Sequence, residues 1–170
     1  MSFKWIGAIL VITGCGGMGF AMAAAYKREE WMLRCLINAL EYMTCELQFR
    51  MTPLPALCRQ AGRECRGAVG KVLTDLAEEL ECQISPDADS CMYAALSRTE
   101  NLPRETREAL RMLGTSLGRF DLQGQLRGLE LVRSHCRGIL ESLSRDRDKR
   151  VRSYQTLGVC AGAALAILFV

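Results

Sequence analysis

Two long apolar segments bracket this 170-residue chain, and nearly all of its charge lies between them. Trp5–Tyr26 contains no charged residue over 22 positions, and Ser153–Val170 contains none over 18 positions. The intervening residues carry 21 of the 22 Lys and Arg residues and all 19 Asp and Glu residues. A helix needs about 20 apolar residues to cross a bilayer, and only a helix satisfies its own backbone there. The pattern therefore predicts two transmembrane helices around one polar domain.

The chain divides on this interpretation into an N-terminal transmembrane helix (1–26), a helical domain (27–152) and a C-terminal transmembrane helix (153–170). An alternative interpretation treats the first segment as a signal peptide, because Ile12-Thr13-Gly14-Cys15 fits a lipoprotein cleavage box. The apolar run continues to Tyr26 without a polar linker, which favours a retained span.

Basic residues flank the inner ends of both apolar segments, whereas the outer ends offer only Lys4 and the terminal amine. Short basic flanks stay on the cytoplasmic side of a membrane. We therefore expect the domain in the cytoplasm and both termini outside it. The inner basic residues are Lys27, Arg28, Arg145, Arg147, Lys149, Arg150 and Arg152.

The middle region has the composition of an all-α protein. Leu, Glu, Arg and Ala are common in it, and no apolar–polar alternation of the kind typical of strands occurs. We expect a membrane-anchored bundle of about five to six helices between the two spans. The expected helices are a continuation of the first span through Arg34–Arg50, a stretch from Pro53 that Gly62 and Gly67 interrupt, Val69–Cys82, Ser85 to about Arg98, Arg104–Leu117, and a last helix from Asp121.

Small polar residues mark the expected helix starts. Thr52 and Ser85 each precede a proline, which predicts an N-cap followed by Pro at the first helical position. Asp121 is the predicted N-cap of the last helix, which continues unbroken into the second span. An apolar stripe along this helix predicts packing against a helix of the same chain, with an intermolecular coiled coil as the alternative. The stripe is Leu122, Leu126, Leu129, Val132, Cys136, Leu140 and Leu143.

Both spans carry faces of small residues. Gly17, Ala21 and Ala25 recur every four residues in the first span, and Gly158 and Gly162 form a GxxxG motif in the second. Small residues allow transmembrane backbones to approach closely. These five positions are the predicted contact between the two spans.

No catalytic, cofactor-binding or metal-binding pattern is recognisable. The single histidine, His135, lies beside Cys136 without the further partners that a Cys-His dyad needs. The glycines at 14–17 follow no strand and so form no phosphate-binding loop. The middle region is weakly basic and poor in aromatic residues, which argues against nucleic-acid binding. We predict a protein that is not an enzyme, with no cofactor and no small-molecule substrate.

Nine cysteines are present, of which Cys15 and Cys160 lie in the spans. The other seven are an odd number and include no CxxC pair, so we expect reduced thiols that serve as small core residues. The competing hypothesis is a membrane-anchored redox or metal sensor built on these cysteines. The seven are Cys35, Cys45, Cys58, Cys65, Cys82, Cys91 and Cys136.

One bend is a candidate partner interface or hinge. Gly114 and Gly118 lie four residues apart, which permits a close helix approach or a helix end. Together with Leu117, Asp121 and Gln125 they form a glycine-containing bend before a capped helix. The alternative is a turn that only reverses the chain.

Four stretches, taken in order, resemble the stage III sporulation protein AB family over essentially the whole chain. They are the Gly-rich first span, Thr52–Leu57, Leu113–Asp121 with Gln125 behind it, and Tyr154–Gly162 before an apolar C-terminus.

The resemblance implies a component of the mother cell-to-forespore channel complex that endospore formation needs. It implies a location in the mother-cell membrane facing the forespore. Family domains are similar to the helical domains of type II secretion and type IV pilus platform proteins, which sit against a hexameric ATPase. The implied partners are the lipid bilayer and the other subunits of the sporulation complex, including its ATPase.

Overall fold

The computed structural model contains six α-helices and no strand in the part of the chain that it describes. It describes the backbone of residues 2–82, 87–118 and 121–169, and the side chains of residues 25–82, 87–118 and 121–145. This confirms the predicted all-α class. The helices are α1 (Ser2–Phe49), α2 (Leu54–Glu64), α3 (Ala68–Cys82), α4 (Ala88–Ser97), α5 (Arg104–Ser116) and α6 (Leu122–Phe169).

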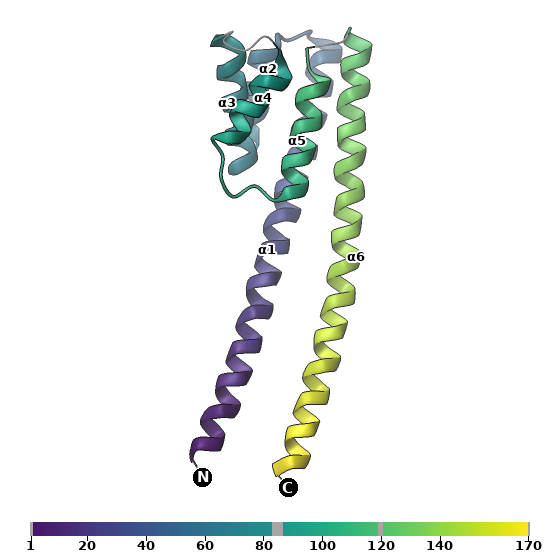
Figure 1. Ribbon diagram of the computed structural model, residues 1–170. Helices are drawn as coiled ribbons and strands as arrows, with labels where there is room; N and C mark the ends of the chain where they lie inside the picture. The colour runs from purple at the N-terminus through teal and green to yellow at the C-terminus, as the bar shows by residue number, and fades with distance from the viewer. Residues whose placement is uncertain (1, 83–86, 119–120, 170) are drawn as a thin grey trace.

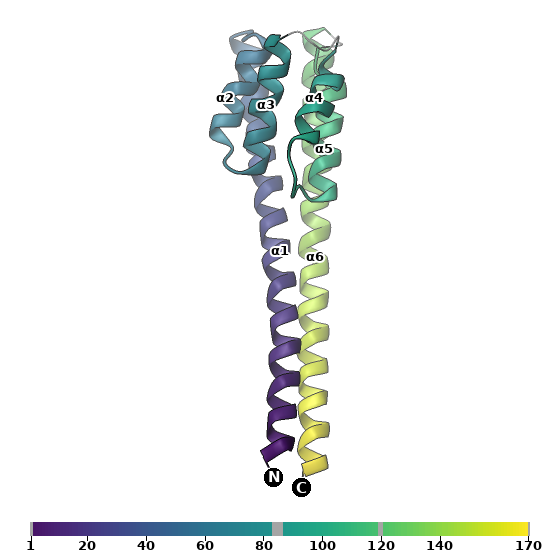
Figure 2. The same cartoon turned by 60° about the vertical axis from the view of Figure 1, so that its left-hand side comes forward.

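The two long helices, α1 and α6, run side by side and bring the two chain ends to the same end of the molecule (Figure 1). The four short helices gather around the opposite end. Figure 2 shows α2 and α3 beside α1, and α4 and α5 beside α6. Each helix packs on the next one in sequence, and the contact between α1 and α6 closes the bundle. The prediction that each terminal apolar segment continues into a helix of the domain is confirmed.

One hydrophobic core fills the bundle and receives side chains from all six helices. Burial of these apolar side chains is the main favourable contribution to folding. The largest fully buried side chains are Met32, Leu33, Leu36, Leu40, Met43, Leu57, Leu73, Leu76, Met92, Leu110, Leu113 and Leu117.

The predicted apolar stripe of α6 faces the interior of the bundle. Leu129, Val132 and Cys136 are fully buried, and the remaining stripe residues pack against the core. The intramolecular interpretation of this stripe is confirmed. Between α1 and α6, Glu41 of α1 also accepts hydrogen bonds from Arg133 at 3.5 Å and from Arg137 at 3.0 Å.

The start of α2 differs from the prediction. Thr52 is not its N-cap, because the Thr52 hydroxyl donates to Glu46 Oε2 at 2.9 Å. The N-cap is Pro53, whose carbonyl accepts from the Leu57 N–H at 3.0 Å. The prediction for Gly62 is also wrong, because α2 continues through this buried residue to Glu64.

The other two predicted caps have different outcomes. Asp121 caps α6 as predicted, since its Oδ1 accepts from the Gly124 N–H at 2.9 Å. The cap of α4 is Asp87, whose Oδ1 accepts from the Ser90 N–H at 3.1 Å, and Ser85 is therefore not the cap. The structure of Ser85 itself lies outside the described residues.

A pair of arginines fixes the end of α4 to its neighbours. Arg98 forms an ion pair with Glu79 of α3, a carboxylate that is almost fully buried. Arg107 of α5 donates to the carbonyl oxygens of Leu96 and Thr99, at 3.3 Å each. These two bonds join α5 to the end of α4 and to the loop that follows it.

In the part of the chain that the structure describes, no helix is both long enough and apolar enough to cross a membrane. The predicted spans fall mainly on residues 1–24 and 146–170, whose side chains lie outside the described residues. The same holds for the predicted contact positions Gly17, Ala21, Gly158 and Gly162. Ala25, the fifth of these positions, is exposed.

Candidate functional site

The five residues of the candidate interface lie at the end of α5 and the start of α6, on both sides of the turn between them. Gly114 and Leu117 are buried, so they position the turn and do not contribute to its surface. Gly118 and Asp121 are exposed, and Gln125 is half-buried.

The two glycines have separate physical roles. A Cβ on Gly114 would lie 2.6 Å from Met92 Cβ, so glycine permits the close approach of α5 to α4. Gly118 has a φ of 76°, a conformation that glycine adopts without strain. Its position also brings three segments together, because a Cβ there would contact Ala88 of α4 and Leu54 of α2.

The turn therefore belongs to a larger surface at the end of the bundle opposite the chain ends, which we call the tip surface (Figure 1). Its other part is the end of α1 and the turn that follows, where Phe49 is 79% exposed and Met51 is 74% exposed. We define the tip surface as Phe49, Met51, Gly118, Asp121 and Arg127. Asp121 and Arg127 line a shallow depression in it together with Gln123 and Gly124.

Sequence reasoning did not identify Phe49 and Met51. Their signal was the helix break that follows them at Thr52-Pro53, since apolar residues next to a break lie on a turn and are readily exposed. The exposure of these two large apolar side chains makes the end of α1 a candidate contact site.

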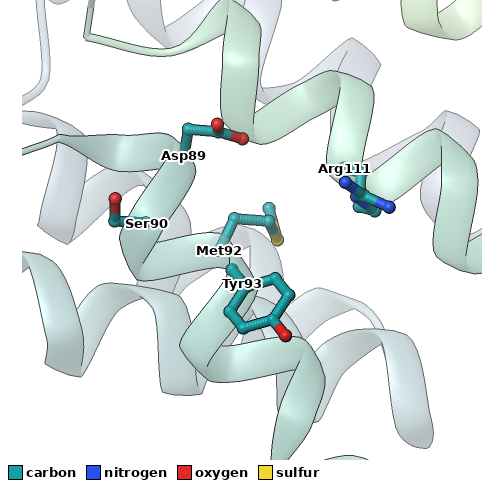
Figure 3. Close-up of a pocket in the computed structure, with 5 residues that line it drawn as sticks. All are labelled: Asp89, Ser90, Met92, Tyr93 and Arg111. Atoms are coloured by element: carbon teal, nitrogen blue, oxygen red, sulfur yellow. The ribbon is translucent and has the colours of Figure 1, made fainter.

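A second depression lies between α4 and α5 (Figure 3). Asp89, Ser90, Met92 and Tyr93 line it from α4, and Arg111 lines it from α5. Tyr93 is 70% exposed. None of these residues was a sequence candidate.

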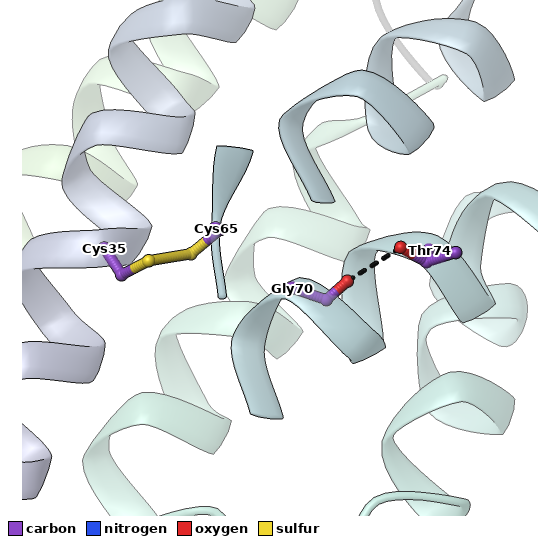
Figure 4. Close-up of a disulfide and its surroundings, with 4 residues drawn as sticks. All are labelled: Cys35, Cys65, Gly70 and Thr74. Atoms are coloured by element: carbon purple, nitrogen blue, oxygen red, sulfur yellow. Dashed lines mark hydrogen bonds between the residues drawn. A yellow bond between two sulfur atoms is a disulfide. The ribbon is translucent and has the colours of Figure 1, made fainter. Parts of the chain in front are cut away.

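The cysteines differ from the prediction in two respects. Cys45 and Cys82 are exposed and are not core residues, and two other cysteines are not free thiols. Cys35 of α1 and Cys65 at the end of α2 form a disulfide with a Cα–Cα distance of 5.5 Å (Figure 4). The expectation that all domain cysteines are reduced is therefore wrong for this pair. The reason is tertiary: the packing of α2 on α1 brings together two residues that are 30 positions apart.

The expectation of core thiols is confirmed for Cys58, Cys91 and Cys136, which are buried. Burial raises the pKa of Cys58 to about 12 and the pKa of Cys136 to about 11. Because the thiolate is the nucleophile, neither cysteine is suited to covalent catalysis at neutral pH. Among the described side chains, no three of His, Cys, Asp or Glu lie close enough together to bind a metal ion.

These differences predict the order of thiol alkylation at pH 8. The exposed Cys45 and Cys82 should react with iodoacetamide within minutes, whereas Cys58 and Cys136 should react only after unfolding. The slow alkylation of the two buried thiols follows from their raised pKa values, which keep them protonated at this pH. Mass spectrometry of tryptic peptides, with and without urea, measures the order. Fast modification of Cys58 in the native protein would contradict the buried position.

Comparison with known proteins gives the family. The model of the stage III sporulation protein AB family matches residues 4–170. The chain belongs to this family. A relative in it, stage III sporulation protein AB of Bacillus subtilis (strain 168), is 24% identical over 168 residues, which cover 97% of this chain and 98% of the relative.

A solved structure of a stage III sporulation protein AB (SpoIIIAB) has the same fold. It superimposes with a TM-score of 0.63 at 19% identity, covering 72% of this chain and 98% of the other. The family resemblance predicted from the order of motifs is thus confirmed. Membership in the stage III sporulation protein AB family implies a role in sporulation, and the tip surface is the candidate contact site of this family member.

Proposed function

We propose that this member of the stage III sporulation protein AB family is a membrane-anchored platform in the mother-cell membrane facing the forespore. In this proposal it spans the membrane twice, its domain (27–152) is cytoplasmic, and it assembles with other subunits of the channel complex. The observation that carries the proposal is the arrangement of α1 and α6, which run side by side from both chain ends to the bundle (Figure 2). Such a pair holds a domain at a fixed distance from the place where the chain ends lie.

The sequence of the two long helices supports the anchor. Their outer parts coincide with the uncharged segments Trp5–Tyr26 and Ser153–Val170, and basic residues follow or precede these segments on the side of the domain. A bilayer accommodates helices of this length and composition, and basic flanks favour the cytoplasmic side. The small residues at Gly17, Ala21, Ala25, Gly158 and Gly162 provide the proposed contact between the spans.

We further propose that the tip surface docks the ATPase of the same sporulation complex. It lies at the end of the bundle farthest from the proposed membrane, where a cytoplasmic partner has unobstructed access. Phe49 and Met51 supply exposed apolar area, and Asp121 and Arg127 supply charges in the other part of the tip surface. Central apolar anchors with charged neighbours are typical of protein–protein contact sites.

Substitution at the tip surface tests this role. Phe49→Glu should weaken capture of the ATPase by the full-length protein by about ten-fold, because it places a carboxylate where an apolar anchor would be buried. Arg127→Glu should weaken capture through charge reversal. Capture is measured by co-purification from membranes of sporulating cells that express both proteins.

The matched control is Tyr93→Glu, which changes an aromatic residue of similar exposure on α4 that does not belong to the tip surface. It should leave capture unchanged, and all three variants should remain in the membrane fraction. Equal capture by the Phe49, Arg127 and Tyr93 variants would remove the tip surface as the docking site. Release of the wild-type protein by a carbonate wash would remove the proposed anchor.

A further inference from the structure

The disulfide lies where the α2–α3 turn meets α1. Cys65 ends α2, and its N–H donates to the Ala61 carbonyl at 3.1 Å. Cys35 is half-buried on α1, and Cys65 is 2% exposed. The bridge is thus a covalent link between a long helix and the turn of a helical hairpin (Figure 4).

This turn is built for close packing. Gly67 has a φ of 83°, and a Cβ there would lie 3.1 Å from the Trp31 ring, one helical turn before Cys35. Gly70 contacts the Cys65 backbone so closely that a Cβ would lie 1.5 Å from the Cys65 carbonyl oxygen. The glycines therefore permit the close approach of the turn to α1 and of α3 to Cys65. The side of α1 that carries Trp31 and Cys35 covers the turn.

We propose that Cys35 and Cys65 are a reversible oxidation site, a thiol–disulfide couple that fastens the α2–α3 turn to α1. The half-buried position of Cys35 leaves it within reach of an external thiol. The nearby Cys58 is fully buried in the hairpin and does not compete for the bridge. Disulfides that occur in a reducing cytoplasm are usually redox-sensing, and this step of the argument rests on the proposed cytoplasmic location.

The chemistry is thiol–disulfide exchange with a low-molecular-weight disulfide as the oxidant. The two cysteine thiols lose two electrons and two protons as their S–S bond forms, and the oxidant is reduced to two thiols. In the reverse direction an external thiolate attacks Cys35, the more exposed partner, and Cys65 leaves as a thiolate that takes up a proton. A second external thiol then releases Cys35 from the mixed disulfide.

Reduction should open the turn without unfolding the hairpin. Leu57, Leu73 and Leu76 are fully buried in the core. We expect this burial to keep the hairpin on the bundle when the bridge is absent. The bridge ties Cys65, at the end of α2, to α1. Its loss therefore increases local opening around Cys65, where Arg63 and Arg66 on either side are exposed.

Equilibration in glutathione buffers tests reversibility. The full-length protein in lipid vesicles is incubated at different ratios of reduced to oxidised glutathione, quenched with acid and labelled with a polyethylene-glycol maleimide. We expect labelling of Cys35 and Cys65 to rise and fall together with the ratio in both directions. A bridge that persists in excess dithiothreitol until denaturant is added would overturn the proposal, as would two thiols that persist in excess oxidised glutathione.

Limited trypsin digestion tests the opening of the turn. Cleavage after Arg63 or Arg66 should be on the order of ten-fold faster in the reduced protein than in the oxidised protein. Cys35→Ser and Cys65→Ser should behave like the reduced protein under all conditions, and Cys45→Ser, which removes an exposed thiol from α1, should behave like the wild type.

Cleavage after Arg63 carries an internal check, because the cut lies between the two bridged cysteines. The oxidised fragments should stay joined on a non-reducing gel and separate on a reducing one. Equal cleavage rates in the two states would overturn the proposed fastening. Capture of the ATPase, measured separately on both states, distinguishes a failure of the platform proposal from a failure of the redox couple.

Discussion

Gly70→Ala is expected to lower the free energy of unfolding by about 3–5 kcal/mol, because the added Cβ has no space. It would lie 1.5 Å from the Cys65 carbonyl oxygen and 2.7 Å from the Gly62 carbonyl oxygen. Both obstacles are backbone atoms, so a rotamer change cannot relieve the overlap. Relief requires separation of α2 from α3, which would expose part of the core.

Urea unfolding of the full-length protein under reducing conditions, followed by circular dichroism, measures the effect of Gly70→Ala. The control is Gly138→Ala on α6, where a Cβ has no atom within 4 Å. That substitution should be neutral or stabilise the helix by about 0.5–1 kcal/mol, because alanine has the higher helix propensity. Equal stability of the two variants would contradict the described packing of α2 on α3.

Leu129→Ala is expected to cost about 2–5 kcal/mol, through lost apolar burial and the cavity that remains. Leu129 is fully buried on α6, in the core of the bundle. The cost should appear as a lower urea midpoint with an unchanged slope, because the surface exposed on unfolding stays nearly the same.

Two residues further along α6, Leu131 offers a control of identical chemistry. It is 59% exposed, so Leu131→Ala should change stability by less than about 0.5 kcal/mol. A large effect of Leu131→Ala with a small effect of Leu129→Ala would mean that the other face of α6 is buried, as an intermolecular coiled coil would require.

The tip surface was only partly predictable. The bend at Gly118 and the cap at Asp121 depend on contacts within a few residues, so the local sequence indicated both. Phe49 and Met51 belong to the same surface only because the end of α1, the start of α2 and the α5–α6 turn lie at the same end of the bundle. No local pattern carries that information.

The caps show the same limit on a smaller scale. A threonine or serine before proline predicts an N-cap, yet Thr52 donates its hydroxyl to Glu46 and leaves Pro53 as the cap. The competing partner lies on the preceding helix, six residues away, and becomes available only when the chain turns back.

The sequence by itself determined the all-α class, the two long terminal helices, the apolar stripe of α6 and the cap at Asp121, because helical periodicity and capping act over a few residues. Only the tertiary structure decided that Cys35 meets Cys65, that Gly114 packs against Met92 and which large apolar side chains remain exposed. The first two features join residues that are distant in sequence. The third depends on which side chains the neighbouring helices cover. Their physical cause is the packing of the helices, which no single segment specifies.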